Sequence, residues 1–341
     1  MRYLFLLCFA VNLLNAQPSS SNQEAALAGH DPVWLARGER RLGKPEHSAA
    51  HGYYTYIFAS AESRAEFRSD PERYSIQMDG ACARMGPASG AGSPDRWAVH
   101  AGRIYIFASD QCRASFVREP DSYLDPPEPA KAVNAEMGEI ARKWLARARE
   151  AHGVNSAMRE YREVSSRRIE AGMLTRTYRW SYSGEITEEF DYPKYGLYGD
   201  TVTVEKGVYF VKGKQEPHRP AQYRERARQL WRHPLALLSD SHAGVPAAWP
   251  EREGSEAREI AIDRFGATTR LGIAPATFRV VSMRYRGRGP EMTLGEIVDR
   301  FSDYRSVSGV LVPFRRESTF NGKPWPERAR TLDSAEVNPA P

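Results

Sequence analysis

Two cysteines and two histidines have the most specific chemistry in this sequence. Cys82 and Cys112 are the only cysteines after the first few residues, and His51 and His100 each stand just ahead of an aromatic, β-branched run. Thiolate and imidazole groups together suit a soft ion such as Cu(I) better than Mg²⁺ or Ca²⁺. These residue types therefore indicate a metal site formed by His51, Cys82, His100 and Cys112, with copper or another soft metal ion as the cofactor.

The same residues also fit simpler structural roles. In an oxidising compartment Cys82 and Cys112 can form a disulfide, which the chain-entropy model values at about 3–4 kcal/mol. The two histidines can pack against equivalent neighbours, and Met78 and Met85 beside Cys82 can fill a core. The sequence leaves the choice between a disulfide, two buried thiols and a metal site open.

An enzyme is the competing class of function. Cys82 could act as a nucleophile with His51 or His100 as its base, in a thiol-dependent or metal-dependent enzyme. However, no G-x-S-x-G, G-x-G-x-x-G, P-loop or H-E-x-x-H motif occurs in a matching context. The sequence therefore favours a binding protein over an enzyme, and we assign no catalytic residue.

The first residues have the layout of a secretory signal peptide. Arg2 precedes an apolar run from Tyr3 to Leu14, and Ala16 is a small residue at the expected cleavage point. The run is shorter than the roughly 20 residues that a helix needs to cross a bilayer. We therefore expect a signal peptide over residues 1–16 and a periplasmic or secreted mature chain without a transmembrane segment.

Composition and charge indicate an ordinary globular chain. The 341 residues are 41% hydrophobic and 27% charged, which is close to average domain usage, and the length fits two domains. The net charge of +5 comes from arginines that alternate with acidic residues. A nucleic-acid-binding protein would concentrate basic residues on one element, so we exclude nucleic acid as a partner.

An internal repeat organises the first part of the chain. The stretch YIFASAESRAEFRSDPERY (56–74) aligns without gaps to YIFASDQCRASFVREPDSY (105–123). In each copy the aromatic, β-branched run predicts a strand, and Ser60 or Ser109 predicts the N-cap of a short helix. An acidic residue followed by proline then ends the helix. We expect two strand–turn–helix units that share one small core.

This repeat resembles the YHS domain family. In that family a tyrosine-rich strand runs into Phe-Cys-Ser-x-x-Cys, and the following helix ends at Asp-Pro-x-x-Tyr. Here the two copies read FASAES and FASDQC, so only Cys112 remains of the motif cysteines. GHDPVWLARGER (29–40) and MDGACARM (78–85) are similar to two further segments of exported members. The resemblance covers about residues 24–128 and implies metal handling through paired cysteines, most of which this chain lacks.

The second part of the chain follows a proline-rich stretch, PPEPAKAV, which indicates a linker at residues 129–134. Apolar residues at helical spacing predict a helix that ends at Gly153. Alternating stretches with turn glycines predict an antiparallel meander, interrupted by a second helix within AQYRERARQLWRHPLALL that ends near Pro234. His152 and His233 stand at the ends of these helices, which favours a structural role over that of a catalytic base.

This order of elements resembles the lipoprotein-sorting (lipoprotein-carrier) superfamily over residues 135–335. The similar segments are AREAHGVNSAMREYREV and RFSDYRSVSGVLVPFRRESTFNGK, with Val154 where the family has a second glycine. The resemblance implies a curved antiparallel sheet over helices, with an apolar cavity that can hold acyl chains. We expect seven apolar side chains to line that cavity: Trp144, Trp180, Tyr182, Phe210, Trp231, Leu235 and Phe314.

The predicted fold class is α+β, with a small strand–turn–helix repeat (YHS-like) domain followed by a curved antiparallel β-sheet domain packed on helices. The predicted function is an extracytoplasmic binding protein that holds a lipid or other apolar ligand in its C-terminal domain, beside a YHS-like module with a soft-metal site. A purely structural protein that binds an envelope partner is a third class that the sequence leaves open.

Overall fold

The computed structural model describes residues 25–125, 132–155, 157–239, 247–253 and 256–338. The predicted signal peptide (1–16) and the first half of the predicted linker (129–134) lie outside these ranges. The chain divides into an N-terminal unit (Met1–Asp125, Arg219–Glu225 and Glu291–Leu294) and a C-terminal unit (Pro126–His218, Arg226–Pro290 and Gly295–Pro341). Within the described ranges, no helix is long and apolar enough to cross a membrane.

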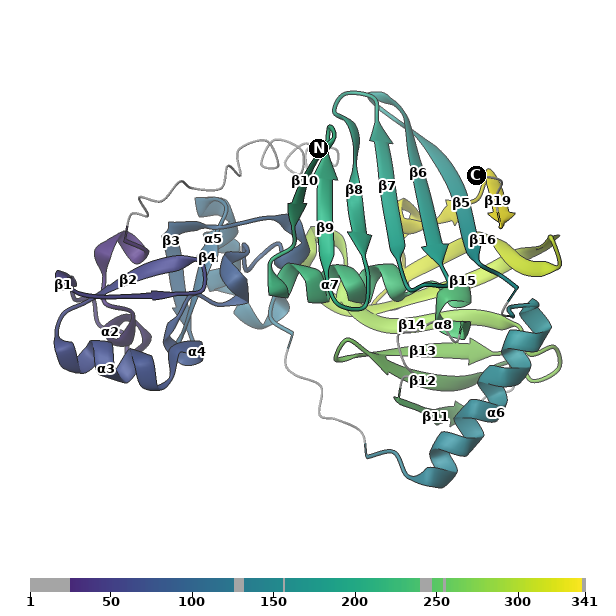
Figure 1. The fold of residues 1–341 in the computed structure, drawn as a ribbon, viewed down its shortest axis with the longest axis horizontal. Helices are drawn as coiled ribbons and strands as arrows, with labels where there is room; N and C mark the ends of the chain where they lie inside the picture. Colours follow the sequence, from purple (N-terminus) through teal and green to yellow (C-terminus); the bar gives the residue numbers. More distant parts are fainter. Residues whose placement is uncertain (1–24, 126–131, 156, 240–246, 254–255, 339–341) are drawn as a thin grey trace. The chain divides into compact units, whose positions relative to one another are not determined.

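The N-terminal unit contains two antiparallel hairpins of the same design (Figure 1). In the first copy β1 (Lys44–His51) pairs with β2 (Tyr54–Phe58), and in the second copy β3 (Ser93–His100) pairs with β4 (Arg103–Phe107). Both pairs have a register irregularity at the same position in the first strand. The two repeated stretches therefore form equivalent hairpins.

A short helix follows each hairpin. The helices α3 (Ala61–Ser69) and α5 (Asp110–Arg118) begin after Ser60 and Ser109, whose hydroxyls accept the backbone N–H of the third helical residue. Both helices end where an acidic residue precedes proline, and α4 (Pro71–Tyr74) or a 3₁₀ turn (Pro120–Ser122) continues the chain. These N-caps and helix ends are those expected from the sequence.

The likeness of the two copies extends upstream of the hairpins. Asp31, at the N-cap of α2 (Pro32–Ala36), donates its backbone N–H to the carbonyl of Arg41, and Cys82 donates in the same way to Gly90. The residue three positions before each has a left-handed φ, of 50° and 51°. Asp31 and Cys82 are therefore structural equivalents, although no sequence identity relates them.

The two copies share part of their core, as the sequence predicted. Phe67 of α3 packs on Tyr56 and Phe58, and Phe116 of α5 packs on Tyr105 and Phe107. The first cluster of buried side chains also contains Ile104 and Ile106 of β4, which belong to the second copy. A second cluster forms around Phe116, because each helix folds back onto its own hairpin.

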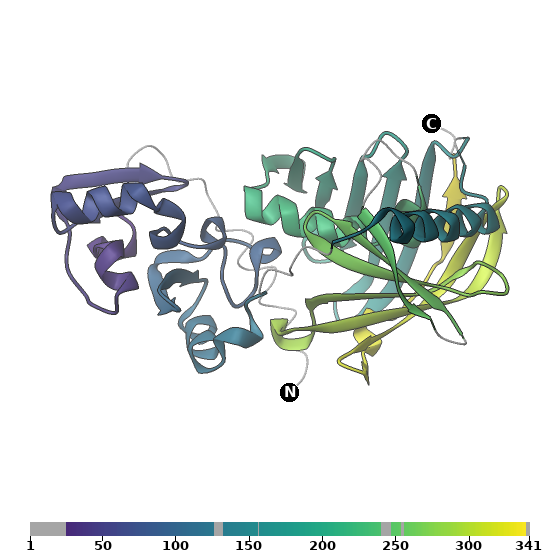
Figure 2. The same ribbon diagram turned by 90° about the horizontal axis from the view of Figure 1, so that it is seen from below.

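The C-terminal unit consists mainly of antiparallel sheet (Figures 1 and 2). One sheet has the order β10-β9-β8-β7-β6-β5-β19, and the other runs β11-β12-β13-β14-β15-β16-β17, with β18 also paired to β16. The antiparallel prediction is confirmed, but the strands form two sheets because two helices, α7 (Pro220–Trp231) and α8 (Pro234–Leu238), separate β10 from β11. The strand bounds are β5 Glu160–Ile169, β6 Gly172–Ser181, β7 Ile186–Tyr192, β8 Gly196–Val202, β9 Gly207–Val211, β10 Lys214–Pro217, β11 Ala247–Glu253, β12 Arg258–Arg264, β13 Ala267–Ile273, β14 Val280–Arg288, β15 Leu294–Val307, β16 Val310–Phe320, β17 Lys323–Pro324, β18 Arg330–Thr331 and β19 Ser334–Val337.

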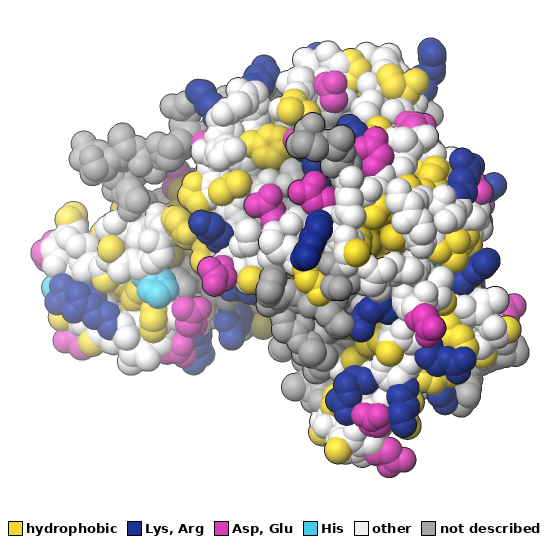
Figure 3. All heavy atoms as spheres, turned by 45° about the vertical axis from the view of Figure 1, so that its right-hand side comes forward, with side chains coloured by type: hydrophobic (Ala, Val, Ile, Leu, Met, Phe, Trp, Pro, Cys, Tyr) yellow, Lys and Arg dark blue, Asp and Glu magenta, His cyan; other side chains and the backbone are white. Residues whose placement is uncertain are grey.

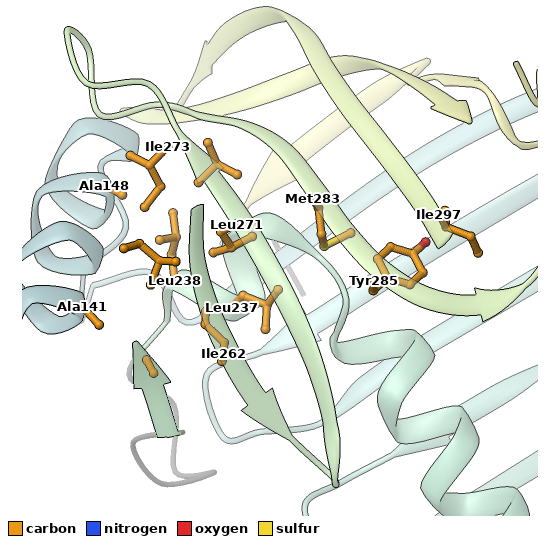
Figure 4. Packing of buried hydrophobic residues seen from close by; sticks show 13 residues of the cluster. Ala141, Ala148, Leu237, Leu238, Ile262, Leu271, Ile273, Met283, Tyr285 and Ile297 are labelled. Carbon is orange, nitrogen blue, oxygen red and sulfur yellow. The ribbon is translucent and has the colours of Figure 1, made fainter. Parts of the chain in front are cut away.

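The helix α6 (Ala135–His152) packs on the second sheet and forms the main apolar core with it (Figure 4). Its buried residues Ala141 and Ala148 are small, so the helix approaches the strands closely. Leu238 of α8 and Leu271 of β13 are fully buried in the same cluster. Burial of one such leucine contributes about 1.5–3 kcal/mol, so this cluster anchors the helix.

Two-residue turns that end in glycine close two hairpins of the second sheet. Ser308 and Gly309 between β15 and β16 have φ of 49° and 82°, and Asn321 and Gly322 after β16 have φ of 47° and 76°. Two successive residues with positive φ are typical of the turns that match the strand twist in hairpins. Both turns were predicted from the sequence.

The surface shows no concentration of basic charge on the face drawn in Figure 3. Lysine and arginine side chains are interspersed with aspartate and glutamate, in agreement with the small net charge of +5. This face therefore offers no continuous basic surface for a nucleic-acid backbone.

Candidate functional site

The four predicted metal ligands are not gathered in one place. The His51 Nε2 lies 3.8 Å from a carboxylate oxygen of Glu72, and the His100 Nε2 lies 3.3 Å from one of Asp121. Each imidazole also meets the edge of the phenylalanine in its own copy. Among the described residues, no group of three or more His, Cys, Asp or Glu could hold one ion. The histidines thus have equivalent packing roles, and the predicted set is reduced to the two cysteines.

Cys82 and Cys112 do lie together in the core of the second copy. Both are free thiols, with exposed fractions of 0% and 7%, and they are hydrogen-bonded to each other. The Cys82 sulfur also accepts the backbone N–H groups of Met85 and Ala108. Cys82 is therefore held rigidly by the backbone, while Cys112 is the more accessible of the two.

The two thiols differ in their ionisation. The hydrogen bond with Cys82 lowers the pKa of Cys112 to about 5 against the cost of burial, and the Ser109 hydroxyl and the Arg84 guanidinium add to this. The hydrogen bond that Cys82 donates to Cys112, together with burial, raises the pKa of Cys82. Cys112 is therefore the more readily ionised of the two thiols, and the thiolate is the nucleophilic form of cysteine.

The first copy has a different pair at the same two positions. The Ser63 hydroxyl donates to the Asp31 Oδ2 over 2.6 Å, and the backbone N–H of Ala59 donates to the same oxygen over 2.7 Å. Asp31 is fully buried. The gap-free repeat in the sequence begins at Tyr56 and Tyr105 and does not extend back to Asp31, so it does not reveal this pair. An alignment of the DPVW and CARM segments could have found it.

The seven predicted cavity residues all lie in the C-terminal unit. Three of them are buried, and Trp144 packs on the ring of Phe278 at 5.2 Å. Tyr182 lies beside Trp180, with the ring centroids 6.3 Å apart, and Phe210 is partly buried on β9. Phe314 lines a small cavity of this unit, and the buried three are Trp180, Trp231 and Leu235.

That cavity has a mixed apolar and charged lining. Its volume is about 30 Å³, which is enough for a water molecule or a group of similar size, such as a carboxylate. Both sheets contribute to it, because Glu163 belongs to β5 and Phe314 to β16. The other lining residues are Arg232, His233, Pro234, Met283, Phe301, Pro313, Arg316, Arg330 and Leu332.

One side of the cavity is a matched set of charges. Arg176 bridges Glu163 and Glu188 at 2.7 and 2.5 Å, and the His233 Nε2 lies 3.2 Å from the second Glu163 oxygen. The Tyr161 hydroxyl donates to the same oxygen. Burial opposes the ionisation of Glu163, but the charges and hydrogen bonds of His233 and Arg176 prevail and hold the pKa of this carboxyl well below its ordinary value. Glu163 is therefore ionised at neutral pH.

The other side of the cavity carries unmatched positive charge. Arg316 and Arg330 stand directly opposite each other on β16 and β18, a placement in which like charges are destabilising. The Arg316 Nε is buried without a hydrogen-bond partner, and neither side chain forms an ion pair with a described residue. Burial, followed by repulsion from neighbouring arginines, lowers the pKa of both.

Arginines outnumber carboxylates among the charged groups around this cavity. Arg232, Arg316 and Arg330 line it together with one carboxylate, Glu163. The sequence could not reveal this, because adjacent arginines in a strand are typical of an exposed face. The further charged groups that interact with this lining are Arg176, Arg328, Glu188 and Asp299.

A larger cavity, of about 440 Å³, lies in the N-terminal unit between the two copies. Its size is in the range of small-molecule sites. The Arg40 guanidinium lies over the Trp97 ring at 5.2 Å, and Arg113 pairs with Asp110 at 3.2 Å. Its charged groups therefore already have partners. The remaining lining is Leu35, Gly38, Ala98, Val99 and Val117.

Comparison with known proteins gives partial structural similarity. No family model matches the sequence, and no curated protein matches it. The C-terminal region is similar to a LolA superfamily protein from Nitrosomonas europaea, with a TM-score of 0.37 and 11% identity, over 59% of this chain and 94% of that one. It is also similar to a DUF1329 family protein from Desulfovibrio piger, with a TM-score of 0.35 and 9% identity, over 58% and 93% of the two chains.

Proposed function

We propose that this chain is an extracytoplasmic binding protein whose C-terminal unit takes the acidic group of an amphiphilic molecule between its two sheets. The observation that carries the proposal is the opposed pair of Arg316 and Arg330 at a cavity of carboxylate size. A carboxylate or phosphate placed there would accept hydrogen bonds from both guanidinium groups. It would also cancel the excess positive charge.

The apolar lining supports an amphiphile rather than a free inorganic anion. Met283, Phe301, Phe314 and Leu332 line the same cavity as the two arginines. Ligand sites typically combine such an apolar wall with a few charged groups that fix orientation. The present volume of about 30 Å³ admits only the acidic group, so we expect the sheets to part around Phe301 and Phe314 when the apolar part enters.

Three further parts of the proposal rest on the sequence. The signal-peptide layout of residues 1–16 supports export to the periplasm or beyond the cell. The YHS resemblance supports soft-metal handling by the N-terminal unit, as an alternative to a redox role of its cysteines. The enzyme with a cysteine–histidine pair is not favoured, because His51 and His100 contact carboxylates instead of a thiol.

Native mass spectrometry of the mature chain, purified from an exported preparation without detergent and then incubated with dodecanoate, tests the proposal. We expect an acidic adduct on the wild type and its loss in Arg316→Met. The matched control is Arg315→Met, because Arg315 is the exposed neighbour that pairs with Glu317, and this variant should retain the adduct. Equal retention by both variants, or only a neutral lipid adduct, would refute the anion-binding proposal.

A further inference from the structure

The second copy of the repeat has two cysteines where the first copy has the hydrogen-bonded pair of Asp31 and Ser63. In the first copy Asp31 and Ser63 are joined by a hydrogen bond of 2.6 Å that no oxidation can change. In the second copy Cys82 and Cys112 occupy the equivalent positions and are also hydrogen-bonded to each other. Two thiols in such contact can become a covalent bond, which adds a chemical property that the first copy lacks.

We propose that Cys82 and Cys112 form a redox-active dithiol that is converted reversibly to a disulfide by exchange with a molecule that carries a disulfide bond. The proposal concerns the N-terminal unit alone and does not depend on ligand binding in the C-terminal unit. It also differs from a static structural disulfide, because the bond forms and breaks reversibly.

The two cysteines have different roles in this exchange. Cys112 is the third residue of α5, where its backbone N–H is bonded to the Ser109 hydroxyl, and the positive end of a helix favours a thiolate. Cys112 is also the more exposed sulfur, so it is the attacking residue. Cys82 is fully buried, so it can react only with Cys112.

The exchange takes place in two balanced steps. The Cys112 thiolate attacks one sulfur of the external disulfide, so that a bond forms from Cys112 to that sulfur and the other sulfur leaves as a thiolate. Cys82 then loses its proton and attacks the Cys112 sulfur, which releases the second external thiolate. The protein loses two electrons and the external disulfide gains them. One proton from Cys82 and one from water give two external thiols.

Equilibration of the reduced mature chain in glutathione buffers of stepped oxidised-to-reduced ratio tests this inference. The samples are acid-quenched, alkylated and weighed by mass spectrometry. We expect the two wild-type thiols to disappear together, without a stable adduct, and to return when the ratio is reversed. Cys82→Ser should accumulate one glutathione on Cys112, whereas Cys112→Ser should leave Cys82 unmodified, with a rate at least tenfold lower.

Two controls distinguish a loss of thiol reactivity from a loss of folding. Cys112→Ser introduces the residue that the first copy has at this position, so we expect it to fold, and circular dichroism checks both variants. If a variant does not fold, the wild-type titration decides alone. Wild-type thiols that stay reduced in excess oxidised glutathione, or that are lost one at a time, would overturn the inference. Resistance that a chelator removes would overturn it in favour of a metal site.

Discussion

The interior of the C-terminal unit has two ends of opposite character. We call the cluster of α6, α8 and strands β11 to β14 the apolar end, and the charged groups around the small cavity the ionic end. At the apolar end, Leu238 and Leu271 stabilise the fold through the burial of their apolar side chains. At the ionic end, Arg316 and Arg330 oppose each other, and neither forms an ion pair with a carboxylate of the described residues. Folding stability explains the first end but not the second.

This difference separates two kinds of buried group. Buried ion pairs are weak evidence for stability, because desolvation offsets most of the attraction. Arg176 forms ion pairs with two carboxylates, Glu163 and Glu188. Arg316 and Arg330 are attracted by Asp299, Glu163 and Glu188 without forming an ion pair with a described residue, and this is why we propose that an anion binds between them.

The largest effect is expected from Glu163→Gln at the ionic end. Loss of this charge leaves Arg176 and His233 with reduced compensation inside the unit, so we expect a loss of about 4 kcal/mol in the free energy of unfolding. Urea denaturation measures it. Glu317→Gln, which removes an exposed charge, is the matched control and should change stability by less than about 0.5 kcal/mol. Similar losses of unfolding free energy in both variants would show that the buried charge of Glu163 matters no more to stability than the exposed charge of Glu317.

A slightly smaller effect is expected from Leu271→Ala at the apolar end. The change removes buried methyl groups and leaves a cavity, so we expect a loss of about 3 kcal/mol. Dodecanoate retention should persist in this variant under conditions where it remains folded, because Leu271 does not line the small cavity. Loss of the ligand from the folded variant would show that the two ends are not independent.

Of the three substitutions, Arg316→Met should have the smallest effect on stability, and it should stabilise the protein where the other two destabilise it. Replacement of an unmatched buried cation by an apolar side chain relieves its repulsion with Arg330, so we expect the free energy of unfolding to rise by about 1 kcal/mol in the absence of ligand. The stabilisation that dodecanoate gives to the wild type should be absent. A strong destabilisation would mean that Arg316 supports the fold through contacts of its own.

The two ends should also respond to acid in different pH ranges. His152 at the end of α6 is buried, and burial lowers its pKa, while its Nε2 accepts the N–H of Val280. Because the unfolded chain binds this proton more readily, stability should begin to fall below pH about 6.5. The pKa of Glu163 is lowered, so its contribution should be lost only below pH about 4.5. His152→Gln should remove the upper part of this dependence, and an unchanged profile would exclude His152 as its source.

The sequence predicted the features that depend on local chain geometry. The helix that ends at Gly153 and the turns at Ser308–Gly309 and Asn321–Gly322 were all predicted, because glycine and its neighbours determine them locally. The break near Pro234 was also predicted: α7 ends at Trp231, and His233 is the N-cap of α8, which begins at Pro234.

Features that depend on pairing between distant strands were not predicted. Period-2 reasoning places apolar side chains inward, whereas Glu163, Arg176 and Glu188 point inward and satisfy one another across β5, β6 and β7. The opposition of Arg316 and Arg330 exists only because β18 pairs back onto β16. The strand register shows that these charged residues are buried. The same residues on an outer face would be ordinary surface charges.

The most direct test of the central claim is a comparison of dodecanoate with dodecanol by isothermal titration calorimetry on delipidated wild-type protein. The two molecules share a chain and differ in the acidic group. The account predicts that dodecanoate binds at least tenfold more tightly and that inorganic phosphate competes only weakly. Equal affinity for the two would contradict the claim that Arg316 and Arg330 recognise an anion, and phosphate binding as tight as that of dodecanoate would contradict an amphiphilic ligand.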